Sequence, residues 1–161
     1  MKKRIFSAVV ICAVLVGAIC LLNRIGVKET EVGEAFDGAV NEYPGVTLTV
    51  AEGSVQRGQV VITALNTTDK EIESGNEHDF GLQKEVNGVW YAVKPKEGEW
   101  ANTAEALLFL KDEPVELTCN WAGRYGVLSD GHYRIVKSFF EYRGPGDYTD
   151  FLLAAEFTIG S

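Results

Sequence analysis

Hydrophobic and polar residues follow different patterns in three parts of the chain. Residues 5–22 are uncharged and almost entirely apolar, residues 23–44 show no sustained period, and from Gly45 onward apolar and polar residues alternate. Successive side chains of a β-strand point to opposite faces, so a period of two predicts half-buried strands. The pattern therefore predicts an N-terminal hydrophobic helix at 1–22, a linker at 23–44 and a β-domain at 45–161.

The alternating runs of the β-domain are short and separated by turn-forming residues. The clearest runs cover residues 46–50, 59–65, 106–110, 115–121, 132–142 and 148–159. Two more, 80–86 and 89–93, flank Asn87-Gly88, a pair typical of a type I′ hairpin turn because both turn positions need positive φ. Runs at about 8–12-residue spacing, without a convincing long helix, predict an all-β antiparallel sandwich of seven to eight strands.

The N-terminal apolar run has the length and flanks of a membrane segment. It follows Lys2-Lys3-Arg4, and its 18 residues would form a helix of about 27 Å, close to the hydrocarbon thickness of a bilayer. Three outcomes stay open: an uncleaved signal anchor, a signal peptide cleaved after residues 16–18, or lipid attachment at Cys20 within a partial lipobox. Each places the C-terminal domain on the extracytoplasmic side of the cell membrane.

The segment between this run and the β-domain is expected to be an extended tether. Residues 23–44 mix charges, glycines and isolated apolar residues, and a short helix around 29–36 is the one regular element considered. The chain has a formal net charge of -8, but residues 31–161 carry 10 basic and 22 acidic groups, a net of -12. Such an acidic body repels phosphate backbones, so no nucleic acid is expected as a partner.

A local pattern predicts how the two sheets are joined. Leu128, Gly131 and Tyr133 stand at the start of the long 132–142 run, in the spacing of a structural tyrosine corner. In that motif the phenol bonds to backbone a few residues upstream and holds the crossover between sheets.

Several motifs come in one order along the chain. They are Asn66-x-Thr68, Gly88-x-Trp90-Tyr91, Trp121 with Tyr125-Gly126, and Gly131-x-Tyr133-Arg134-Ile135-Val136-Lys137. The series resembles a bacterial immunoglobulin-like domain of membrane-tethered or lipid-anchored envelope proteins of Gram-positive bacteria, over residues 45–159. The resemblance implies a β-sandwich outside the membrane and no catalytic residues. Paired cysteines of the antibody type are lacking, so packing alone must hold the sandwich.

Catalytic chemistry finds little support in the sequence. The two histidines, His78 and His132, lie outside any zinc-binding spacing, and neither a nucleophile elbow nor a phosphate-binding loop is present. Cys119 shares a strand face with Leu117 and Trp121 and is expected to be a buried, inert thiol. We therefore predict no catalytic, metal-binding or cofactor-binding residues, and no enzyme.

The function predicted from these features is a non-enzymatic binding or accessory module. Its partners would be the membrane, through the N-terminal anchor, and an envelope protein or glycan, bound at loops 66–70, 94–105 and 143–147 or on an exposed aromatic strip. The alternative is a protease-inhibitor-like module, because Asn66-Thr67-Thr68 weakly resembles the Asn-Pro-Thr-Thr-Gly loop of small immunoglobulin-like protease inhibitors.

Overall fold

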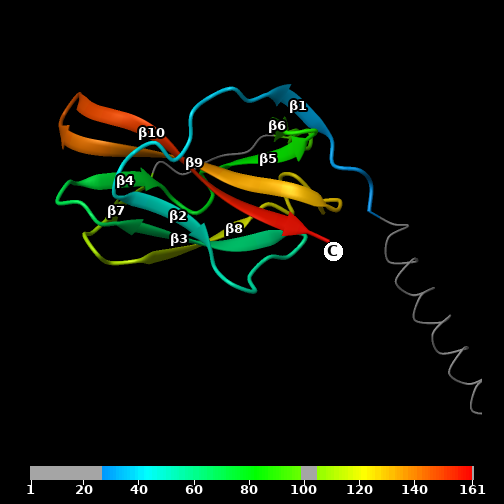
Figure 1. Ribbon diagram of the computed structural model, residues 1–161, viewed down its shortest axis with the longest axis horizontal. Helices are drawn as coiled ribbons and strands as arrows, with labels where there is room; N and C mark the ends of the chain where they lie inside the picture. Colours follow the sequence, from blue (N-terminus) through cyan, green and yellow to red (C-terminus); the bar gives the residue numbers. More distant parts are fainter. Residues whose placement is uncertain (1–26, 99–104, 161) are drawn as a thin grey trace, which may run out of the picture.

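The computed structural model describes residues 27–98 and 105–160, and these residues form ten β-strands and no helix (Figure 1). The strands are β1 (Val32–Ala35), β2 (Val46–Val50), β3 (Gln59–Asn66), β4 (Ile72–Gly75), β5 (Gly81–Val86), β6 (Val89–Val93), β7 (Ala106–Phe109), β8 (Val115–Asn120), β9 (Gly131–Gly144) and β10 (Asp147–Ile159). The prediction of an all-β antiparallel sandwich is confirmed. The predicted number of seven to eight strands is too low.

The strands form two antiparallel sheets around one core. The larger sheet has the order β1-β6-β5-β9-β4-β7, with β10 paired along the other edge of β9, and the smaller sheet has the order β2-β3-β8. Strand β9 is long enough to pair with two strands along one edge. Its first half pairs with β5 and its second half pairs with β4. It therefore runs the length of the molecule and connects both ends.

The core lies between the sheets, where the period of two places it. Val60, Ile62 and Ala64 of β3 are fully buried and belong to the same core as Leu153, Ala155 and Phe157 of β10. Aromatic rings pack in two groups. Trp121 stacks with Phe157, which stacks with Tyr133, while Phe109, Phe139, Phe151 and Tyr43 form a second series. Burial of these rings provides the cohesion that disulfides supply in other sandwiches of this size.

The two hairpins differ in how well the sequence describes them. In the β5–β6 hairpin, Asn87 and Gly88 have φ of 54° and 80°, so the predicted type I′ geometry is confirmed. The predicted loop 143–147 is mostly strand, because β9 continues to Gly144 and β10 begins at Asp147. Only Pro145 and Gly146 separate the two strands.

The predicted linker is partly built into the sandwich. Residues 32–35 form β1, which pairs with β6 through Val32↔Val93 and Ala35↔Tyr91, so the short helix considered around 29–36 is wrong. Further along, the Asn41 side chain accepts a hydrogen bond from the Ala154 amide at 2.8 Å and donates one to the Ala154 carbonyl at 3.1 Å. Backbone pairing at open sheet edges outweighs the weak local pattern here.

The hydrophobic helix predicted for residues 1–22, including Cys20, lies outside the described residues. Within 27–98 and 105–160, no helix has the length and apolar character needed to cross a bilayer.

Candidate binding surfaces

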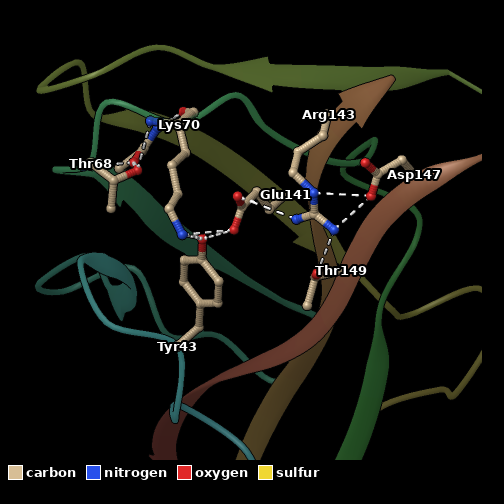
Figure 2. A network of polar contacts seen from close by, with 8 residues as sticks. Tyr43, Thr68, Lys70, Glu141, Arg143, Asp147 and Thr149 are labelled. Carbon is tan, nitrogen blue, oxygen red and sulfur yellow. Dashed lines mark hydrogen bonds and ion pairs between the residues drawn. The ribbon is translucent and has the colours of Figure 1, made fainter. Parts of the chain in front are cut away.

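A network of charged and polar groups joins the β3–β4 loop to the β9–β10 hairpin (Figure 2). Lys70 Nζ donates to Glu141 Oε2 at 2.8 Å and to the Tyr43 hydroxyl at 3.0 Å, and that hydroxyl donates to the same carboxylate oxygen at 2.5 Å. On the other side of Glu141, Arg143 lies 3.3 Å from Oε1 and donates to Asp147 at 2.8–3.0 Å. We call these five residues the end-loop network.

The charges of the end-loop network stabilise one another. The Glu141 side chain is 13% exposed, and hydrogen bonds from Lys70 and Tyr43, followed by one from Arg143, lower the pKa of its carboxyl to about 2. The Glu141 carboxylate in turn raises the pKa of Lys70, and burial raises the pKa of Tyr43. Glu141 therefore stays ionised over the physiological range and keeps the loop and the hairpin together.

The loop 66–70 is held by the side chain that begins it. Asn66 is fully buried, and its amide nitrogen donates to the carbonyls of Phe109 at 2.9 Å and Lys70 at 3.1 Å. Its oxygen accepts from the Thr68 amide at 2.9 Å, which closes an Asx turn. Thr67, Asp69 and Lys70 of this loop are open to solvent, whereas Thr68 is half-buried.

The residues of the predicted tyrosine corner come together at the other end of β9. Leu128 and Tyr133 are fully buried, and the Tyr133 hydroxyl donates to the Ser129 carbonyl at 3.0 Å, four residues upstream. A Cβ on Gly131 would lie 2.9 Å from Lys84 Cε and 3.2 Å from the Tyr133 ring, so a side chain here would displace the Lys84 ammonium from its partners.

The corner also holds the incoming chain. The Tyr133 hydroxyl lies 3.0 Å from Thr30 Oγ1, and the Ser129 amide donates to the same oxygen at 2.9 Å. The buried ammonium of Lys84 bonds Ser129 Oγ at 3.1 Å and forms an ion pair with Glu29. Residues 29 and 30 are thereby attached to the start of β9.

An open groove of about 720 Å³ lies beside this attachment. It is lined by residues 27–31, 93–97 and 125–127. The predicted recognition loop 94–105 contributes its described part to this groove, and residues 99–104 lie outside the described chain. The groove therefore belongs to the end of the sandwich where the chain comes in.

The family model of the bacterial Ig-like domain matches residues 42–158, nearly all of the two-sheet sandwich just described. The chain belongs to this family. No curated protein and no solved structure matches the chain.

The two histidines and Cys119, for which no catalytic or metal-binding role was predicted, differ in their surroundings in this Ig-like domain. His78 is exposed on the β4–β5 loop, whereas His132 lies between Glu85 at 2.6 Å and Glu156 at 3.4 Å. Within the described ranges, histidine, cysteine and acidic side chains nowhere form a group of three suited to a metal ion. Cys119 is fully buried, and burial raises the pKa of its thiol to about 12.

Besides Lys84, the Ig-like domain has two further buried cations that were not predicted from the sequence. The Lys137 ammonium is buried in the core side of β9 and donates to the carbonyls of Asn76 at 2.8 Å and Asp79 at 2.5 Å, and burial lowers its pKa. Arg134 lies on the opposite face, 4.3 Å from the Trp90 ring centre. The alternation Tyr133, Ile135, Lys137, Phe139 signals an inward lysine, but the loop carbonyls that satisfy it come from distant sequence.

Proposed function

We propose that this Ig-like protein is a non-enzymatic binding or accessory module, tethered to the cell membrane, with its domain on the extracytoplasmic side. The domain presents the loop 66–70 and the β9–β10 turn to a partner in the cell envelope. The end-loop network supports this role, because loops that are fixed before binding lose less conformational entropy when a partner is bound.

One observation carries the proposal: the incoming chain and the end loops lie at opposite ends of the sandwich. Thr30 is bonded to Ser129, just before β9 begins, whereas the turn at Pro145 follows the end of β9. A strand of 14 residues spans roughly 45 Å at about 3.3 Å per residue. Figure 1 shows the blue start of the described chain at one end and the orange turn at the other. The loop 66–70 and the β9–β10 turn would therefore point away from a membrane to which the N-terminus is anchored.

The tether itself is inferred from sequence. An uncharged run of 18 residues after three cations favours a membrane segment, and four residues separate it from Val27. Extraction of membranes with alkaline carbonate is expected to leave the full chain in the pellet. The intact mass of the purified protein distinguishes the three outcomes for the N-terminus: an unprocessed chain, a chain cleaved after residue 18, or a diacylglycerol adduct on Cys20. Recovery of a cleaved chain without lipid in the soluble fraction would contradict the tether.

The protease-inhibitor alternative finds no favourable contact. Asn66 would have to enter a protease cleft with Thr67 and Thr68, yet its side chain is buried and bonded to Phe109 and Lys70. Membership of the Ig-like family favours a non-catalytic role, since proteins of this architecture use the sandwich as a rigid support for loops.

Site-specific photo-cross-linking in intact cells tests the proposed binding end. A photoreactive residue replaces Pro145 in the β9–β10 turn, and a matched control carries it at Glu52, which is exposed in the β2–β3 turn at the tether end. We expect a discrete cross-linked species from position 145 and none from position 52. Equal cross-linking from both positions, or from position 52 alone, would show that the end loops are not the binding surface.

A further inference from the structure

The outer face of the larger sheet carries a row of exposed and half-buried apolar and acidic side chains. Cross-strand partners place Leu108 of β7 beside Glu73 of β4, Glu73 beside Phe140 of β9, and Phe140 beside Asp150 of β10. Directly paired residues of antiparallel strands share a face. Their neighbours Ile72, Phe109 and Phe139 are buried in the core, so the row points away from it. We call these four residues, with Tyr148, the outer row.

Two apolar members of the outer row are open to solvent, and Phe140 between them is half-buried. Leu108 is 51% exposed and Tyr148 is 55% exposed. Tyr148 contacts Phe140 with ring centres 6.2 Å apart and an interplanar angle of 65°. The two rings therefore form a corner rather than one flat surface. A sugar ring stacks on a flat platform, whereas a corner of two rings suits an alkyl stem that ends in a cation.

The acidic members have no cation of their own. Among the described residues, neither Glu73 nor Asp150 takes part in an ion pair or a side-chain hydrogen bond, in contrast to Glu141 and Asp147 of the end-loop network. Arg143 and Lys70 are held by the carboxylates of the end-loop network. The outer row thus combines two uncompensated carboxylates with exposed aromatic and aliphatic surface.

From this juxtaposition we propose that the outer row is the docking surface for a Lys- or Arg-bearing segment of a partner protein. The inference deepens the proposed function, on which it rests, by giving the chemical class of the partner. A cationic head group is placed between Glu73 and Asp150 and over the Tyr148 face, and its alkyl stem lies on Leu108. The net charge of -12 over residues 31–161 attracts such a segment from a distance.

Binding of a labelled deca-lysine peptide to the full chain in neutral detergent tests the inference by fluorescence anisotropy. Glu73→Gln and Asp150→Asn are each expected to weaken binding roughly three- to fivefold, as loss of an exposed ion pair does. Tyr148→Ala is expected to weaken it by a similar factor without changing charge. Glu116→Gln is the matched control, because it removes one exposed carboxylate from β8 on the other sheet.

Each outcome decides the matter. Selective loss in the three outer-row variants, with Glu116→Gln unchanged, supports the inference. Equal loss in Glu116→Gln shows attraction to net charge alone and overturns it. Absence of peptide binding overturns it as well, and Tyr148-dependent binding of chitohexaose would then point to a glycan. If the peptide fails while cross-linking from position 145 persists, the proposed function stands and only the basic partner is lost.

Discussion

At the scale of single residues, the Tyr133 hydroxyl has the largest structural consequence. It is buried and bonds the Ser129 carbonyl at 3.0 Å, and it meets Thr30 at the same distance. Tyr133→Phe leaves that carbonyl without its donor, so we expect a loss of about 1–2 kcal/mol in the free energy of unfolding. Urea denaturation followed by the fluorescence of buried Trp121 measures it. Tyr142→Phe is the control, since no side-chain hydrogen bond of Tyr142 is present in the described chain. An unchanged midpoint for Tyr133→Phe would show that the corner does not stabilise the fold.

The thiol of Cys119 belongs to the same scale. Full burial keeps reagents away from the sulfur. It also raises the pKa of the thiol to about 12, so that little of the reactive thiolate is present at neutral pH. We expect the Cys119 peptide to remain unlabelled by iodoacetamide at pH 8 in the folded protein and to be labelled fully in urea, as read by mass spectrometry. Labelling of folded protein at a rate comparable to that in urea would contradict the burial of this strand face.

At the scale of elements, glycine φ values separate turn positions from strand positions in the β5–β6 hairpin. Gly88 has a φ of 80°, and a Cβ there would meet nothing within 4 Å, so only backbone conformation opposes a side chain. Gly88→Ala is expected to cost about 1–2 kcal/mol of stability. Gly81→Ala in β5 is the matched control: a Cβ there makes an ordinary 3.8 Å contact with the Val136 carbonyl, and its stability should change little. Equal effects in thermal unfolding would mean that the type I′ turn is not required.

The elements also show why sequence reasoning succeeds in the body and fails before it. In β3 every second residue is buried along the whole strand, and in β10 every second residue is buried from Leu153 to Ile159, so a period of two is sustained and the strands are predictable. Strand β1 has four residues, contains Gly33, and is half-buried or exposed throughout, so no period develops. Its position is set by the free edge of β6, which only the folded sheet provides.

The binding surfaces follow the same logic. The Asx turn at Asn66 and the hairpin turn at Gly88 are local, and their residue types indicate them directly. The end-loop network joins Tyr43, Lys70 and Glu141, whose side chains meet across 27 to 98 residues of sequence. Strand register decides such contacts, and a single sequence does not specify register between distant strands. The exposure of Leu108 in the outer row could be predicted from the sequence. Residues 107–110 are four consecutive apolar residues, and successive residues of a strand point to opposite faces, so some of them must face away from the core.

At the scale of the whole molecule, the sandwich is held at its two ends by different chemistry. At the tether end, Tyr133, Ser129 and Thr30 bind through neutral hydroxyls and backbone, and the Lys84–Glu29 ion pair adds one charged contact. At the other end, the end-loop network depends on the charge of Glu141. Acid should therefore act unequally on the molecule: protonation of Glu141 loosens the loop-bearing end, whereas the hydroxyl contacts at the tether end persist when Glu29 is protonated. A binding module built this way would lose its presented loops in acid before it lost its fold.

The pH dependence of stability tests this asymmetry. The pKa of Glu141 is lowered from 4.5 to about 2 in the folded protein, so its stabilisation is complete above 4.5 and is lost as pH falls toward 2. Glu141→Gln should be less stable than the wild type at pH 7, and the difference in urea midpoint should shrink between pH 5 and pH 2 until the two curves meet. Other acids with lowered pKa, such as Glu29 and Glu31, act equally in both proteins and cancel. Glu116→Gln should run parallel to the wild type throughout. A difference between Glu141→Gln and wild type that stays constant with pH would mean that the Glu141 charge does not hold the two loops together.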